Sequence, residues 1–283
     1  MSLSLGQKAG WGLADMGIVV FVIVKQLLIL AFMNSFLGIP IALAGAVTTA
    51  VLIFDIITDP IIGYFSDKTV SRFGRRAPWM LVGAVVLALA MIGLFAVPEN
   101  FTTNASLVWV IVFFLISTLG FTMVSIPYGA MAGEMTLDKK ERSSMTAWRM
   151  AFASLGILIG GALIPILAGD TKSGYTFAAI CVAPLIILSI WFSVFFTRNA
   201  PRTLVPSQQN FSYILKLVFA NRAFVTLVIL YGIMTLAIAL ITAGLPFAAM
   251  YLIMDDGNSL LSGVAKGLGT LSLMFAAFVL GSI

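Results

Sequence analysis

Two aspartates lie four residues apart in an apolar stretch of this sequence, within the segment FDIITDPIIGYFSDKTVSRFGRR. The i,i+4 spacing places Asp55 and Asp59 on one face of a helix. Two carboxylates side by side repel each other, and removal from water adds to the cost. They could hold a metal ion for catalysis, hold an ion for transport, or provide a cap for a helix that ends in water. The choice depends on what surrounds the helix.

Composition indicates that the surroundings are mostly lipid. The chain has 283 residues, of which 61% are hydrophobic and 10% are charged, whereas soluble domains have about 25% charged residues. The apolar runs are long enough for spanning helices, and they lack the alternation of a transmembrane barrel. We therefore expect an all-α polytopic membrane protein in contact with the lipid bilayer. Nucleic acid is not an expected partner, because the basic residues fall between the apolar runs.

Some classes of chemistry are excluded by residues that the sequence lacks. It contains no histidine, the usual proton shuttle and a common metal ligand. Cys181 is the single cysteine, so neither an intrachain disulfide nor a cysteine metal cluster can form. Proton or cation handling must then fall to carboxylates and neutral oxygens. We expect no cofactor, only a coupling ion, Na⁺ or H⁺.

Hydropathy predicts eight spans whose intervening gaps alternate in charge. The spans are 10–36, 41–65, 79–97, 106–132, 146–169, 175–197, 222–250 and 260–283. Lysine and arginine concentrate in every second gap, on the side that also carries Lys8. The positive-inside rule places that side and the N-terminus in the cytoplasm, which predicts a multi-pass protein of the inner (plasma) membrane.

The longest gap divides the chain. We interpret 1–197 as an N-terminal six-helix transmembrane bundle, 198–221 as a cytoplasmic linker, and 222–283 as a partial C-terminal bundle of two helices. Because the last span runs apolar to the final residue, we expect a fragment of a longer chain whose missing C-terminal helices would be its partners.

Further polar residues lie inside the predicted spans. Lys25 is near the middle of the first span, and Thr122 and Ser125 precede Pro127 in the fourth, where proline leaves backbone carbonyls free. Taken alone, a threonine such as Thr122 is more often an ordinary helix-packing residue than a ligand. Arg149, at the start of the fifth span, could extend to the membrane surface or point into a cavity.

Several of these motifs resemble the glycoside–pentoside–hexuronide:cation symporters, the melibiose-permease-like carriers of the major facilitator superfamily. The resemblance rests on GWGLADMG, on Asp55-x-x-x-Asp59-Pro60, on the basic loop after it, on Ser125-Ile126-Pro127-Tyr128, on TLDKKERSSM (136–145) and on Arg149 with Phe152-Ala153-Ser154. It covers the first six spans in order. It implies a major facilitator fold, with a complete N-terminal six-helix bundle and the first two helices of the C-terminal bundle.

The resemblance also implies roles for individual residues. The cation site, with Na⁺ as one candidate ion, would be formed by Asp55, Asp59 and Thr122, with Thr58 where melibiose-type members carry asparagine. Arg149 would bind the sugar. The basic loop would be the cytoplasmic gate, and its residues are Gly63, Asp67, Arg75 and Arg76.

Two departures from the family pattern concern the substrate. The sugar-binding aspartates of melibiose-type members align with Gly17 and Ser125, which argues against a neutral galactoside. Lys25 is an additional cation in the first span. It could join Arg149 in attracting an anionic substrate such as a hexuronide, or it could neutralise Asp55 or Asp59.

Two alternatives remain open. A lysophospholipid or other amphiphile transporter of the same fold would also lack the sugar-binding acids. An intramembrane prenyltransferase would use a DxxxD motif to hold Mg²⁺ on a pyrophosphate, but it needs a second acidic cluster. The later acids Asp170, Asp255 and Asp256 fall on the opposite side in the predicted topology. Symport of a sugar or glycoside is therefore the favoured function, and we do not expect an enzyme.

Overall fold

The computed structural model describes residues 3–169, 171–200 and 220–252, and within these ranges the regular elements are all helical. Within the described part of the chain, six apolar stretches are long enough to cross a membrane: Leu5–Ser35, Ile41–Lys68, Ala77–Phe95, Thr103–Met135, Lys139–Ala168 and Lys172–Thr197. They coincide with the first six spans predicted from hydropathy. The all-α polytopic prediction is confirmed.

Two of the six spans contain a π-helical turn. The first span consists of α1 (Leu5–Ile23), the π-helical turn η1 (Val24–Leu28) and α2 (Ile29–Ser35). The fifth consists of α6 (Lys139–Leu158), η2 (Ile159–Leu163) and α7 (Ile164–Ala168). Such turns widen the helix locally, and they occur often at functional sites.

The other helices are continuous. They are α3 (Ile41–Lys68), α4 (Ala77–Phe95), α5 (Thr103–Met135), α8 (Lys172–Thr197) and α10 (Arg222–Leu252). Helix α10 coincides with the seventh predicted span, 222–250. The eighth span, 260–283, and most of the linker at 198–221 lie outside the described residues, and the division into domains stays a prediction.

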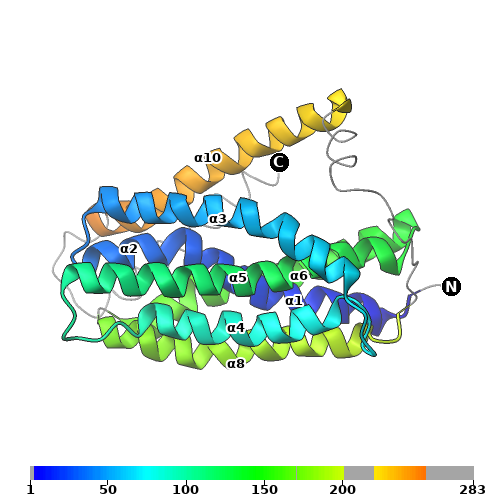
Figure 1. Ribbon diagram of the computed structural model, residues 1–283, viewed down its shortest axis with the longest axis horizontal. Helices are drawn as coiled ribbons and strands as arrows, with labels where there is room; N and C mark the ends of the chain where they lie inside the picture. Colours follow the sequence, from blue (N-terminus) through cyan, green and yellow to red (C-terminus); the bar gives the residue numbers. More distant parts are fainter. Residues whose placement is uncertain (1–2, 170, 201–219, 253–283) are drawn as a thin grey trace.

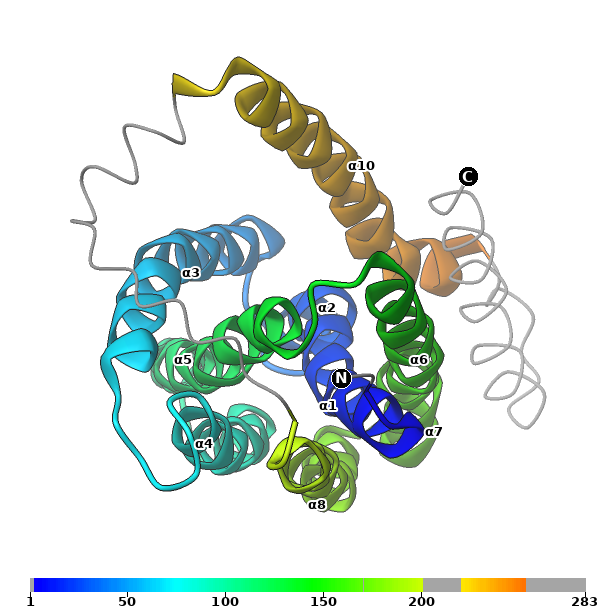
Figure 2. The same cartoon turned by 90° about the vertical axis from the view of Figure 1, so that its right-hand side faces the viewer.

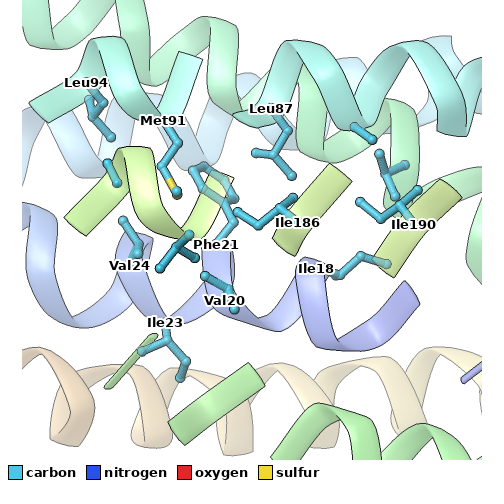
Figure 3. Packing of buried hydrophobic residues seen from close by; sticks show 14 of the residues in the cluster. Ile18, Val20, Phe21, Ile23, Val24, Leu87, Met91, Leu94, Ile186 and Ile190 are labelled. Atoms are coloured by element: carbon cyan, nitrogen blue, oxygen red, sulfur yellow. The ribbon is translucent and has the colours of Figure 1, made fainter. Parts of the chain in front are cut away.

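The six spans form an antiparallel bundle (Figure 1). Figure 2 looks along it from the end that carries the N-terminus and shows α1 between α6 and α8, with α4 beside α5 and α8, and with α3 on the outside against α5. The core lies between α1, α4 and α8, where Phe21, Leu87, Met91 and Ile186 are fully buried (Figure 3). Helix α10 lies beside the bundle and contacts α2 and η1.

Glycines allow α1 and α6 to pack closely. A Cβ atom at Gly12 would lie 2.8 Å from the Arg149 nitrogen, and one at Gly156 would lie 2.6 Å from the Met16 oxygen. A Cβ atom at Gly160 would likewise come too close to Val20 and Ile23. In lipid the hydrophobic effect does not drive helices together. Close packing of their surfaces drives association instead, and small residues permit that packing. Through this contact α6 carries Arg149 up to α1.

Helix α3 is the least buried of the six spans. In its most apolar window 22% of residues are buried, against 61% in the first span. Its described contacts are mainly with α5 and α2. Because α3 carries both aspartates of the DxxxD motif, α5 and the first span set the surroundings of these acids.

Candidate cation and substrate sites

Three helical segments bring the two aspartates together with one cation and one hydroxyl. Lys25 projects from η1 and pairs through Nζ with Oδ2 of Asp55. The Thr122 hydroxyl of α5 lies 3.1 Å from Oδ1 of Asp59 and 3.3 Å from Oδ1 of Asp55. Lys25, Asp55, Asp59 and Thr122 are called the carboxylate site below.

The carboxylate site is largely buried, with Asp59 half-buried. The Thr122 side chain is fully buried, and the side chains of Lys25 and Asp55 are 10% and 16% exposed. Lys25 Nζ also lies 5.8 Å from the centre of the Phe121 ring, a cation–π contact. Two carboxylates and one ammonium leave one unbalanced negative charge. Such a site suits a single additional monovalent cation.

The Thr122 hydroxyl has one proton and two carboxylate neighbours. It can donate to only one acceptor at a time in a linear hydrogen bond, so Asp55 and Asp59 compete for the same proton. Thr58 behaves differently, since its hydroxyl lies 3.0 Å from the Phe54 carbonyl and 3.3 Å from that of Asp55, within its own helix. Its predicted role as a cation ligand stays a prediction.

A second charged pair lies between α1 and α6. Nε of Arg149 donates to Oδ2 of Asp15 at 3.1 Å, and the Asp15 side chain is 4% exposed. The guanidinium lies 5.7 Å from the centre of the Tyr128 ring, which stacks on Trp11. The Arg149 side chain is 41% exposed, so Arg149 remains accessible to a ligand while Asp15 holds it.

Polar atoms beside this pair are buried without a partner. Neither Oδ1 of Asp15 nor the Tyr128 hydroxyl has a hydrogen-bond partner within the described part of the chain. Buried polar groups are normally satisfied, so this end of α1 offers an acceptor and a hydroxyl next to an accessible arginine. Asp15 and Tyr128 both lie within motifs that carry the family resemblance, but neither was predicted from the sequence as a site residue.

The other predicted substrate residues are Gly17, Ser125 and Lys25. Gly17 faces α8, where an added Cβ would collide with Oγ of Ser189. This close contact between helices explains the glycine. Ser125 is half-buried on α5, one turn from Thr122. Lys25 is engaged by Asp55, which is the neutralising arrangement among its two predicted roles.

The predicted gating loop is anchored to α5. The Arg76 guanidinium lies 3.0 Å from both Asp67 and Glu134, and Arg75 lies 2.9 Å from Glu134. Gly74 turns the loop with a φ of 93°, a value that favours glycine. Glu134, at the end of α5, was missed from the sequence because it lies outside the loop motif, although an acid opposite a paired arginine is a recognisable signal.

The described residues do not support a catalytic metal cluster. Within the ranges that the structure covers, no group of three or more acidic, cysteine or histidine side chains is placed to hold a metal. The later acids Asp170, Asp255 and Asp256 lie outside the described residues.

Comparison with known proteins supports a role in transport. A family model described as MFS/sugar transport protein matches residues 10–282. YagG of Escherichia coli K12, a candidate glycoside/cation symporter, is 30% identical over 225 residues, which make up 77% of this chain and 48% of YagG. The symporter YjmB of Bacillus subtilis 168 is 30% identical over 239 residues, 81% of this chain and 51% of YjmB.

A further relative is named as an importer of sulfoquinovose. A candidate sulfoquinovose importer of Salmonella typhimurium LT2 is 27% identical over 198 residues, 68% of this chain and 42% of the relative. The chain thus spans about half the length of the curated relatives it matches. With a match to the family model over nearly its whole length and six apolar helices in the order that the resemblance implied, the chain belongs to the MFS/sugar transport family of the major facilitator superfamily.

Proposed function

We propose that this chain supplies the cation site and part of the sugar site of a symporter that couples uptake of a sugar or glycoside to entry of a monovalent cation. The observation that carries the proposal is the carboxylate site, in which Asp55, Asp59 and Thr122 converge within a membrane bundle. Membership of a transport family argues against the intramembrane prenyltransferase alternative.

Ion binding would act through the two conformations of an alternating-access carrier. A ligand shifts such an equilibrium only by its differential affinity for the two states. A cation between Asp59 and Thr122 neutralises the remaining negative charge where α3 meets α5, and it thereby favours the state in which these helices stay together. Substrate and ion then cross as the bundles rock about the site. The coupling ion in this proposal is Na⁺ or H⁺.

The gating loop and Arg149 complete the proposed cycle. The pairs that join Arg75, Arg76 and Asp67 to Glu134 hold the end of the bundle that carries Lys8 and the basic loop, here called the basic end. In the proposed topology the basic end faces the cytoplasm of the cell, with the N-terminus on the same side and the protein in the inner membrane. Arg149 would orient the substrate.

For the substrate we propose an anionic sugar such as a hexuronide. The support is the accessible guanidinium of Arg149, which Asp15 and the buried Tyr128 ring hold in place. The relative named for sulfoquinovose, a sulfonated sugar, is consistent with a charged substrate.

Uptake in membrane vesicles tests the proposed function. A carrier that contains this sequence would be given neutral glycosides, hexuronides and lysophospholipids in turn, under an imposed Na⁺ or proton gradient. We expect one sugar to accumulate with one gradient, and we expect Asp59→Asn to abolish the accumulation because the charge that attracts the ion is gone. Glu99→Gln, at the opposite end of the bundle, is the matched control.

Two results would contradict the proposal. Gradient-driven accumulation in the Asp59→Asn variant at the wild-type level would make the acids structural. Accumulation of a lysophospholipid in place of every sugar would move the carrier to the amphiphile alternative.

A further inference from the structure

Lys25 occupies a position that a coupling ion would otherwise take. Its ammonium group contacts Asp55 directly, and the side chain is 10% exposed. It projects from η1, the π-helical turn in the first span. A π-helical turn shifts the side chains that follow it around the helix axis, and here such a turn carries the lysine that pairs with Asp55.

The ammonium already removes part of the reason for an ion to bind. Without Lys25, two carboxylates would lie on one helix face with only the Thr122 hydroxyl between them. With Lys25, Asp55 has a partner of opposite charge, and Asp59 retains the unbalanced negative charge. An alkali ion that used Asp55 as a ligand would have to displace or approach the ammonium.

The electrostatic effect of Lys25 is large enough to weaken the binding of an added alkali ion. A second unit charge about 4 Å from a like charge lowers affinity by about three orders of magnitude at the effective dielectric constant of partly buried sites. An ammonium and a sodium ion also compete for the same carboxylate oxygens. The flanking Phe121 ring favours the ammonium further by a cation–π contact.

We propose that Lys25 is a resident cation that excludes alkali ions from the carboxylate site. The inference deepens the proposed function, on which it rests for the identity of the coupling site, and it assigns to Lys25 the choice of ion. It predicts that Na⁺ does not bind to the wild-type chain at this site and that removal of the ammonium creates a sodium site from Asp55, Asp59 and Thr122.

Sodium binding to the purified chain in lipid nanodiscs tests the inference without transport. Thermal unfolding would be compared in NaCl and in choline chloride at equal ionic strength, so that screening is the same, and binding of radioactive sodium would be measured in parallel. We expect no sodium-specific effect on the wild type. In Lys25→Met, a neutral side chain of similar size, we expect sodium affinity to rise at least about tenfold, because even a partly screened ammonium at this distance repels a second cation.

Two variants separate charge from structure. Lys25→Arg keeps the positive charge and is expected to exclude sodium as the wild type does. Lys25→Met/Asp55→Asn removes both partners of the pair, so it controls for folding, and it is expected to lose the sodium site. A purely structural lysine would give variants that differ in stability without any preference for NaCl over choline chloride.

Two results would contradict the proposed role of Lys25. It is overturned if wild-type chain binds sodium saturably and Asp59→Asn abolishes this binding, a comparison that does not depend on any Lys25 variant being folded. It is also overturned if folded Lys25→Met shows no sodium-specific effect. Neither result bears on whether a carrier with this sequence moves sugar, since no substrate or gradient is present, whereas failure of Asp59→Asn to affect uptake would remove the proposed function alone.

Discussion

The Thr122 hydroxyl is the single neutral group, among the described residues, that contacts both Asp55 and Asp59. The sequence alone is also consistent with Thr122 as an ordinary packing residue, because threonine is frequent at contacts between membrane helices. Its position between Asp55 and Asp59 depends on α5 packing against α3, which no local pattern reveals. The pair of acids was therefore predictable as a site, whereas the group that links them was only a candidate.

Substitution of Thr122 tests this link. Thr122→Val keeps the shape and removes the hydroxyl, and it should leave two carboxylates in contact with a methyl group. The loss of a hydrogen bond to a charged, poorly hydrated acceptor corresponds to about 1.5–3 kcal/mol, so we expect gradient-driven accumulation to fall at least about tenfold. An uptake assay in membrane vesicles measures this accumulation.

Thr122→Ser is the matched control for that change. It keeps the hydroxyl and should retain most of the activity. Equal uptake by the valine and serine variants would show that the hydroxyl does not take part in coupling.

At the scale of elements, hydropathy located the helices well and their irregularities not at all. The spans match because about 20 apolar residues in a row have few alternatives in lipid. The π-helical turns η1 and η2 were not predicted, since VKQLL and IGGAL differ little in pattern from α-helix. Tertiary packing decides them, and η1 in turn decides where Lys25 lies. The pairing of Lys25 with Asp55 was consequently left as one of two hypotheses.

The packing of α1 against α6 makes a prediction for stability. In Gly156→Ala the new methyl group would lie 2.6 Å from the Met16 oxygen, a backbone atom that cannot move without shifting α1. Overpacking of this kind costs about 1–3 kcal/mol. We expect a lower thermal unfolding temperature in nanodiscs.

Gly45→Ala is the control for this substitution. Gly45 lies in α3 with no atom within 4 Å of an added Cβ, so the same change should be neutral or stabilising by up to about 1 kcal/mol through helix propensity. Equal unfolding temperatures for the two variants would contradict the close contact that the structure shows.

For the whole molecule, charge pairs at the basic end join the loop after α3 to α5. Glu134 contacts both Arg75 and Arg76, so one substitution loosens two pairs. The motif in the loop was visible in the sequence, but its acidic partner is 59 residues away from Arg75, and only the fold brings them together. The linker and last span, for which the sequence also makes predictions, lie outside the described residues.

Loss of Glu134 should make the basic end more accessible. We expect Glu134→Gln to speed the labelling of a cysteine placed at Ser66, which is 1% exposed next to the loop, by a membrane-impermeant maleimide. Breakage of a partly buried charge pair shifts such an opening equilibrium by about 1–3 kcal/mol, or about tenfold in rate. Cys181, which is exposed, would first be replaced by serine.

Glu99→Gln serves again as the control, because it removes one acid from the opposite end. Labelling that is no faster with Glu134→Gln than with Glu99→Gln would show that these pairs do not hold the end closed.

The chain order of the carboxylate site has a consequence for biogenesis. During synthesis, Lys25 is added 30 residues before Asp55. Thr122 is added 67 residues after Asp55. When α3 leaves the translocon with two aspartates, each of which opposes insertion by about 3 kcal/mol at the middle of a helix, α5 has not yet been synthesised. The ammonium in the preceding span is the compensating charge already in the membrane, so Lys25 accompanies α3 into lipid before the site it completes exists.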